Sequence, residues 1–131
     1  MRLCFAIEES NHHDPVKISC EAKKDGSNFI ISGEKSFVID GGFADKVIVA
    51  CRTSGEEGTK DGLSLFVLDS NSKGLTISPT KMVDSRNAAN MKFENVKVSS
   101  DMLIGKEDDA YEIIESVLDI SRAAISAEML G

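Results

Sequence analysis

The sequence lacks an apolar run long enough to cross a membrane. A spanning helix needs roughly 20 consecutive apolar residues, and polar or charged side chains interrupt every hydrophobic stretch of this 131-residue chain. No signal-peptide pattern opens the chain either. We therefore expect neither a membrane-spanning segment nor a secreted product.

Positive charge is also scarce. The chain has 22 Asp and Glu residues against 15 Lys and Arg residues, which gives a net charge of −7 at pH 7. A surface of this sign repels the phosphates of nucleic acids and the headgroups of anionic lipids. We therefore expect neither nucleic acid nor a membrane surface among the partners.

Cysteines are few and show no metal-binding or disulfide pattern. Cys4, Cys20 and Cys51 are odd in number and contain no Cys-x-x-Cys spacing. We expect reduced, buried thiols in a cytoplasmic protein. His12 and His13 are adjacent, so on a strand their side chains point to opposite faces and cannot share a metal ion. We therefore expect no metal site.

What remains is a series of short strand patterns separated by turn residues. The pair Asp25-Gly26 favours a tight hairpin, because it accepts the positive φ of such a turn. The continuous β-branched run at 46–51 predicts a strand buried on both faces. The spacing predicts a mainly β fold, either an antiparallel β-barrel or two crossed antiparallel sheets. The predicted strands are 2–8, 16–22, 28–32, 36–39, 46–51, 63–68, 75–78 and 90–98.

The pattern changes at residue 108. Apolar residues recur from 108 to 131 with a period near 3.6, which predicts one C-terminal helix about 35 Å long. Asp108 and Asp109 are the predicted N-cap and first-turn charges. Apolar side chains occupy several faces of this helix, more than a small β-domain can cover. We therefore expect a homo-oligomer in which the same helix of another copy supplies the cover.

The order of several motifs carries further information. Phe93-Glu94-Asn95-Val96 resembles the Phe-Glu-Asp-Val motif of the acyl-CoA dehydrogenase family, and segments 3–9, 22–26, 30–35, 37–42 and 103–105 follow that family's middle β-domain in order. Ser121-Arg122 and Leu130-Gly131 resemble its first C-terminal helix. The resemblance implies that residues 1–105 form the middle domain and that residues 106–131 begin the C-terminal helical domain.

The family resemblance implies an FAD-dependent oxidoreductase of fatty acid metabolism that oxidises acyl-CoA thioesters at the α and β carbons. The family's catalytic glutamate belongs to a later part of the helical bundle, so we expect a fragment that is inactive alone and holds no catalytic residue. Two alternatives remain open: a fragment of an acyl-CoA oxidase or flavin monooxygenase relative, and a degenerate non-catalytic binding or oligomerisation module. A cytoplasmic location is expected, or the mitochondrial matrix if the parent protein is eukaryotic.

The family's site positions are carried over residue by residue. The family has threonine hydroxyls at the positions of Ile7 and Ile39 and tryptophan at Phe37, so here two flavin-directed hydroxyls are replaced by aliphatic groups. Each lost hydrogen bond is worth about 1 kcal/mol, and we expect weak or absent FAD binding. The cofactor positions are Cys4, Ala6, Ile7, His13, Phe37 and Ile39; the substrate positions are His13, Asp119, Ser121 and Arg122.

Each of these positions also has a structural interpretation. Ile7 and Ile39 are typical of strand core, and Asp119, Ser121 and Arg122 are typical of the polar stripe of an amphipathic helix. The consecutive Glu8 and Glu9 would point to opposite faces of a strand, so they do not suggest paired carboxylates for acid–base chemistry. Glu8 is interpreted as the structural glutamate of the family.

Overall fold

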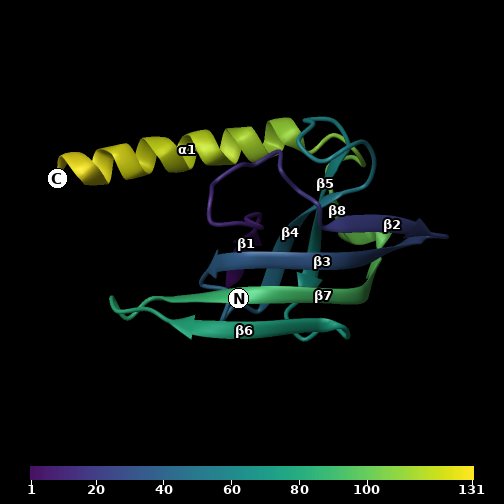
Figure 1. The fold of residues 1–131 in the computed structure, drawn as a ribbon, viewed down its shortest axis with the longest axis horizontal. Helices are drawn as coiled ribbons and strands as arrows, with labels where there is room; N and C mark the ends of the chain where they lie inside the picture. The colour runs from purple at the N-terminus through teal and green to yellow at the C-terminus, as the bar shows by residue number, and fades with distance from the viewer.

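The computed structural model describes residues 1–131 as a strand-rich unit followed by one long helix (Figure 1). The mainly β prediction with a single C-terminal helix is confirmed. In chain order the elements are β1 (Leu3–Ala6), β2 (Glu21–Asp25), β3 (Asn28–Ile39), β4 (Lys46–Arg52), β5 (Leu63–Asp69), β6 (Leu75–Lys81), β7 (Asn87–Ser99), the 3₁₀ turn η1 (Ser100–Met102), β8 (Leu103–Ile104) and α1 (Tyr111–Leu130).

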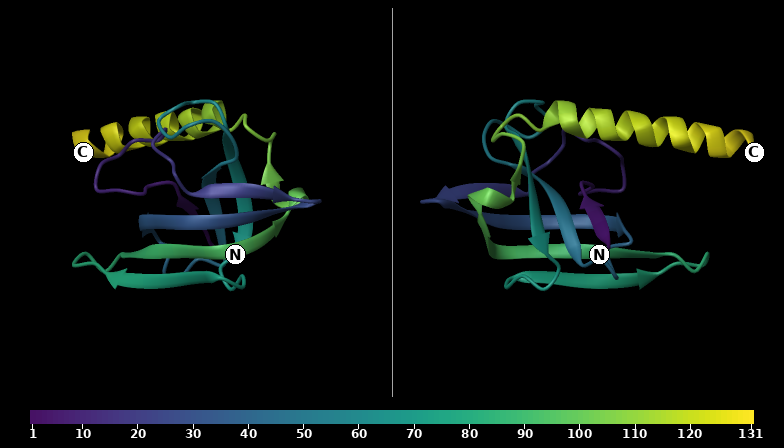
Figure 2. Two further views of the ribbon diagram at one scale, coloured as in Figure 1. Left: turned by 45° about the vertical axis from the view of Figure 1, so that its right-hand side comes forward. Right: turned by 180° about the vertical axis from the view of Figure 1, so that it is seen from behind.

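The strands form one open sheet that bends into two crossed layers. Their order is β6-β7-β3-β2-β4-β5-β8, and β1 pairs with β4 off this path. Strands β6, β7 and β3 run across β4 and β5 in every view (Figure 2). The two-layer prediction is therefore confirmed, with an open edge in place of a closed barrel.

The expectation of purely antiparallel pairing is wrong at one seam. Both β1 and β2 pair with β4 in the parallel sense, β1 over its whole length and β2 through the single pair Glu21 and Arg52. Strands that meet in parallel cannot be joined by a tight turn. Turn signals report only hairpins between consecutive strands, so no turn signal indicates this parallel pairing.

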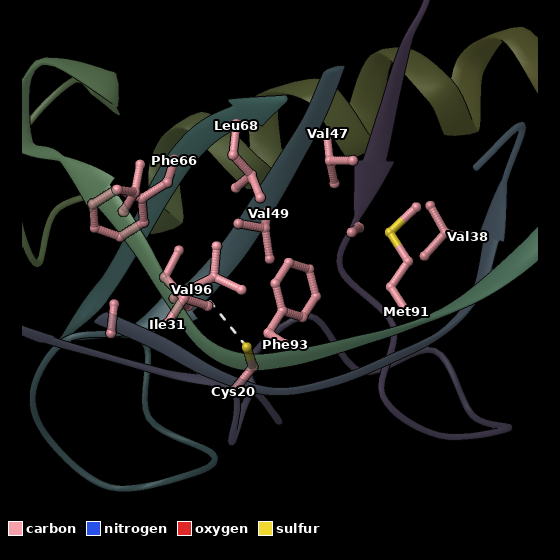
Figure 3. Close-up of a cluster of buried hydrophobic side chains, with 14 of the residues drawn as sticks. Cys20, Ile31, Val38, Val47, Val49, Phe66, Leu68, Met91, Phe93 and Val96 are labelled. Carbon is pink, nitrogen blue, oxygen red and sulfur yellow. Dashed lines mark hydrogen bonds between the residues drawn. The ribbon is translucent and has the colours of Figure 1, made fainter. Parts of the chain in front are cut away.

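The main apolar core fills the space between the two layers (Figure 3). The rings of Phe29 on β3 and Phe66 on β5 meet across it, with centroids 4.9 Å apart. Inward side chains from β1, β4 and β5 face inward side chains from β3 and β7. The largest fully buried apolar members are Phe66, Ile31, Met91, Val47, Val49 and Val96.

A second, smaller core lies between the outer face of the sheet and helix α1. Ile114 of α1 and Ala50 of β4 are both fully buried there. Strand β4 therefore has apolar cover on both faces, as its continuous apolar run predicts. The other buried members are Ile7, Ile18, Leu63, Leu65 and Ala110.

Segment 16–22 is not a strand over most of its length, because side chains satisfy its backbone. The Glu9 carboxylate accepts the N–H groups of Ser19 at 2.8 Å and Cys20 at 3.0 Å. The Arg52 guanidinium donates to the carbonyls of Val16 and Ile18 at 3.0 Å and 2.8 Å. With these groups already bonded, regular pairing begins only at the start of β2.

The two predicted strands 28–32 and 36–39 are one strand, β3, with local irregularities against β7. Its hairpin with β2 is confirmed: Asp25 pairs with Asn28, and Gly26 has a φ of +61°. Gly33 bends the strand at a φ of +148°, where an added Cβ would lie 2.7 Å from the Cys20 Cα atom. Only glycine permits this close approach.

Helix α1 begins three residues later than predicted, at Tyr111, and the predicted cap at Asp108 is wrong. Ala110 occupies the N-cap without a side-chain bond. Asp108 instead accepts hydrogen bonds from the hydroxyls of Thr53 at 2.6 Å and Ser54 at 2.8 Å. Its carboxylate therefore tethers the β4–β5 loop. No helix in this structure has both the length and the apolarity that a bilayer crossing requires.

Candidate functional site

Two of the predicted cofactor positions lie on the exposed surface at the end of β3. Phe37 is 53% exposed and Ile39 is 46% exposed, whereas Val38 between them is buried. A register shift lies between Lys35 and Val38, and the Phe37 N–H donates to the Asn90 side chain at 3.0 Å. The interpretation of Ile39 as strand core is therefore wrong. We call these two exposed apolar positions, Phe37 and Ile39, the platform; their side chains carry no hydrogen-bonding group.

The predicted positions on and after β1 have buried side chains. Cys4 and Ala6 belong to the main core, and Ile7 belongs to the second core under α1. Ile7 thus fits its core interpretation, although it lies just beyond β1. At these three positions only backbone atoms are left to face a ligand.

A buried ion pair fixes the chain that follows β1. Lys35 is 1% exposed, and its Nζ atom lies 2.7 Å from Glu9 Oε1 and donates to the Ile7 carbonyl at 3.1 Å. Burial alone would raise the pKa of the Glu9 carboxyl, but the charge of Lys35 and the hydrogen bonds from Lys35 and Ser19 outweigh it, so this pKa lies below its ordinary value. The structural role expected of Glu8 therefore belongs to Glu9.

His13 lies in the exposed part of the same loop. Its Nδ1 atom contacts the Glu8 carboxylate. The Glu8 carbonyl accepts the Ser36 N–H at 2.8 Å, which anchors the loop beside the Phe37–Ile39 platform. The structure brings Ile7, His13 and the platform into one region, and no three His, Cys, Asp or Glu side chains converge on a metal-like site.

The predicted substrate positions on α1 form a separate group. Arg122 donates to Asp119 at 2.6 Å and to Glu115 at 3.5 Å. The hydrogen bond that Arg122 donates to Asp119, followed by the one that it donates to Glu115, raises the pKa of Arg122. Ser121 bonds back to the Val117 carbonyl at 2.9 Å. No hydrogen bond or ion pair joins these three residues to the platform or its loop.

Arg52, which the sequence patterns did not single out, organises two loops at the C-terminal end of β4. Its guanidinium donates to the carbonyls of Val16, Ile18, Thr59 and Asp61 at 2.8–3.1 Å. Burial lowers the pKa of Arg52, and no carboxylate is paired with it. The sequence does contain a signal for it, a charged residue at the end of an apolar strand and before a glycine-bearing loop.

Comparison with known proteins places this architecture in a family. A family model described as "Acyl-CoA dehydrogenase, middle domain" matches residues 4–96. Acyl-CoA dehydrogenase FadE29 of Mycobacterium tuberculosis is 30% identical over 113 residues, which is 86% of this chain and 29% of the relative. Cyclohexane-1-carbonyl-CoA dehydrogenase of Geobacter metallireducens is 33% identical over 121 residues, or 90% of this chain and 31% of the relative.

A solved structure shows the same fold. A probable acyl-CoA dehydrogenase of Mycobacterium abscessus superimposes with a TM-score of 0.81 at 28% identity, over 88% of this chain and 31% of that one. The chain thus spans less than a third of the length of these relatives. The match runs from β1 into β7 and includes the platform and its anchored loop. The chain therefore belongs to the acyl-CoA dehydrogenase family and contains its middle domain.

Proposed function

We propose that this chain is the flavin-facing β-domain of an FAD-dependent oxidoreductase acting on acyl-CoA thioesters. Residues 1–105 are its middle domain, and residues 106–131 begin its helical domain. The observation that carries the proposal is the exposed Phe37–Ile39 platform beside a loop held by the buried Lys35–Glu9 pair. A fixed backbone next to an open apolar face is the arrangement that a flat, aromatic cofactor needs.

The fit to FAD is incomplete. Phe37 offers an aromatic face for stacking, but Ile39 offers no hydroxyl and the Ile7 side chain is buried away from the platform. When bound, FAD would accept the hydride from the acyl-CoA β carbon. With a stacking surface and no side-chain donors, we propose weak FAD binding and derive no catalytic step for this chain.

The proposal assigns the catalytic base to a part of the parent protein outside this sequence. The two carboxylates of the loop anchored beside the platform are already paired, Glu8 with His13 and Glu9 with Lys35. The lowered pKa of Glu9 also makes it a poor proton acceptor near neutral pH. We therefore expect no acyl-CoA dehydrogenation by the chain alone.

An assay of the purified chain tests this point. Short- to long-chain acyl-CoA would be supplied with added FAD and an artificial electron acceptor. The expected result is no turnover above a protein-free blank. Flavin-dependent reduction of the acceptor above that blank would show that the chain holds its own base.

FAD affinity is tested by flavin fluorescence titration. Ile39→Thr restores a hydroxyl on the platform, and its matched control, Ile125→Thr, makes the same change on an exposed part of α1. A recovered hydrogen bond of about 1 kcal/mol corresponds to roughly fivefold tighter binding for Ile39→Thr only. A wild-type chain that purifies with stoichiometric FAD would overturn the proposal of weak binding.

A second candidate function is a degenerate module that assembles without redox chemistry. The aliphatic Ile39 on the platform favours it, because the side chain stacks but does not orient a ligand through hydrogen bonds. If neither Ile39→Thr nor wild type binds FAD, this second function becomes the better account.

We also propose partners and a location for the parent protein. Asp119, Ser121 and Arg122 are the positions that would meet acyl-CoA once the helical domain is complete. Further copies of the chain are proposed as partners through α1. The three free, buried cysteines favour a reducing compartment, which is the cytoplasm or, for a eukaryotic parent, the mitochondrial matrix.

A further inference from the structure

Two buried cysteines meet in the main core of the β-domain. The Cys20 sulfur lies 3.9 Å from the Cys51 sulfur, and the two residues are 1% and 0% exposed. Both thiols are free, and Cys20 can be followed among the core side chains in Figure 3. The third thiol, that of Cys4, is also buried, but its hydrogen-bond partner is the Lys46 carbonyl at 3.8 Å. The core therefore contains one adjacent pair of thiols and one separate thiol.

The backbone places the paired cysteines directly opposite each other. Strands β2 and β4 pair in parallel at Glu21 and Arg52, and Cys20 and Cys51 are the residues that precede these two. The Arg52 N–H donates to the Cys20 carbonyl at 2.7 Å, which fixes this register. Neighbouring strands lie about 4.7–4.9 Å apart, within the Cα separation of about 4.4–6.8 Å that disulfides adopt. A bond between the two sulfurs therefore needs side-chain rotation and no rearrangement of the strands.

Other groups confine Cys20. Gly33 of β3 packs so closely that a Cβ added there would lie 2.9 Å from the Cys20 sulfur. The Cys20 N–H donates to the Glu9 carboxylate at 3.0 Å, and Glu9 in turn pairs with the buried Lys35. The thiol pair therefore adjoins the ion pair that holds the loop after β1, and all of these groups belong to the β-domain.

The two thiols differ in acidity. The hydrogen bond that the Cys51 S–H donates, together with the positive charge of Lys35, outweighs burial and lowers the pKa of the Cys20 thiol. Burial raises the pKa of the Cys51 thiol well above its ordinary value. Because the thiolate is the form that attacks an oxidant, Cys20 is the nucleophile of the pair and Cys51 is the resolving thiol.

We propose that Cys20 and Cys51 form a redox-sensitive dithiol, which hydrogen peroxide converts into a disulfide that ties the loop preceding β2 to β4. The Cys20 thiolate attacks one peroxide oxygen and breaks the O–O bond, which gives a Cys20 sulfenic acid and, after protonation, one water. The Cys51 thiol then attacks the Cys20 sulfur, and a second water leaves as the S–S bond forms. Each sulfur gives up one electron, both electrons reduce the peroxide, and the two thiol protons leave in the waters.

A short seam controls access to the buried sulfurs. Strands β2 and β4 share a single residue pair, so local loss of that pairing exposes Cys20 to a molecule as small as hydrogen peroxide. The bond would join residues that are 31 positions apart, which restricts the unfolded chain and stabilises the folded one. Disulfides in cytoplasmic proteins are usually transient and redox-sensing. The inference does not depend on flavin binding, and its test is separate from those of the proposed function.

Peptide mapping after oxidation tests the pairing. Trypsin places the three cysteines in separate peptides, 3–17, 18–23 and 47–52. The folded chain is treated with hydrogen peroxide, and the remaining thiols are alkylated under denaturing conditions. We expect peptides 18–23 and 47–52 to be linked and peptide 3–17 to be alkylated. Cys51→Ala should remove the link, whereas the control Cys4→Ala should keep it. Alkylation of all three cysteines in treated wild type, or a link that includes peptide 3–17, would overturn the proposal.

Thermal melts before and after oxidation test whether the bond ties the loop to β4. Wild type and Cys4→Ala should melt several degrees higher when oxidised, and dithiothreitol should reverse this shift. Cys51→Ala should show no reversible shift. Each variant is compared with its own reduced form, so any stability lost through the substitution itself does not enter. A linked wild type that melts no higher than its reduced form would contradict the proposed tie.

Discussion

Both halves of helix α1 carry large apolar side chains, but their surroundings differ. In the first half, Ile114 is fully buried on the sheet and Leu118 packs partly against the same core. In the second half, from 119 to 131, every residue is exposed, including Ile120, Ile125 and Met129. We call this second half the overhang, because it projects past the sheet (Figure 1).

Charged pairs show the same contrast. Lys35 and Glu9 form their ion pair inside the molecule, where it holds the loop after β1. Arg122 and Asp119 form theirs on the overhang, with both side chains open to solvent. A pair of opposite charges thus has different consequences in the two regions, because the cost of an unpaired charge depends on its access to water.

The largest expected effect comes from removing the buried cation. Lys35→Met leaves the Glu9 carboxylate buried without its counter-ion and should cost about 3–5 kcal/mol of unfolding free energy. Arg122→Met, the matched change on the overhang, should leave the urea midpoint almost unchanged, because both partners of that pair are open to solvent. Urea denaturation followed by circular dichroism measures both.

A double variant tests whether the unpaired charge of Glu9 causes the loss of unfolding free energy in Lys35→Met. Lys35→Met combined with Glu9→Gln removes both charges, and it should regain part of the stability that Lys35→Met loses. If the double variant is no more stable than Lys35→Met, the loss comes from packing and the electrostatic contrast between the regions fails.

Truncating an isoleucine in each half of α1 tests the packing contrast. Ile114→Ala removes a fully buried side chain from the second core and should cost about 2–5 kcal/mol. Ile125→Ala on the overhang should change unfolding free energy by less than about 0.5 kcal/mol. The comparison is made at low protein concentration, so that contacts between copies do not contribute. An equal cost for both variants would mean that the overhang is covered in the monomer.

Lowering the pH should reduce the free energy of unfolding through protonation of Glu9. Because the pKa of Glu9 is lowered in the folded state, its contribution to stability is complete above the unfolded value of about 4.5 and is lost as the pH falls through the folded value. Glu9→Gln should flatten this part of the stability profile between about pH 5 and pH 2. Thermal melts across that range check the direction, and an unchanged profile would exclude Glu9 as its source.

The smallest effect is expected from deleting the overhang. A chain that ends at Leu118 keeps the buried residues of both cores. Its unfolding free energy should stay within about 0.5 kcal/mol of the full chain, measured at low concentration by urea denaturation. A chain that ends at Gly105 loses Ala110 and Ile114 and should be clearly less stable. Equal stability of all three chains would remove the distinction between the halves of α1.

Much of the fold and part of the site were predictable from the sequence. Strand β4 was predicted from its unbroken apolar run, the β2–β3 hairpin from Asp25-Gly26, and α1 from its period. These are local signals, because side-chain alternation and turn geometry depend on neighbouring residues. The family followed from the order of such signals, and an aromatic position at Phe37 followed from the family.

The tertiary structure decided what depends on residues far apart in the sequence. It placed β1 in parallel beside β4, gave the structural role to Glu9 instead of Glu8, and used Asp108 to tether a loop instead of capping α1. The sequence by itself determined which faces are apolar and which residues carry charge. Only tertiary packing determined which of those faces are buried, because the burial of a residue depends on the neighbours that it contacts after folding.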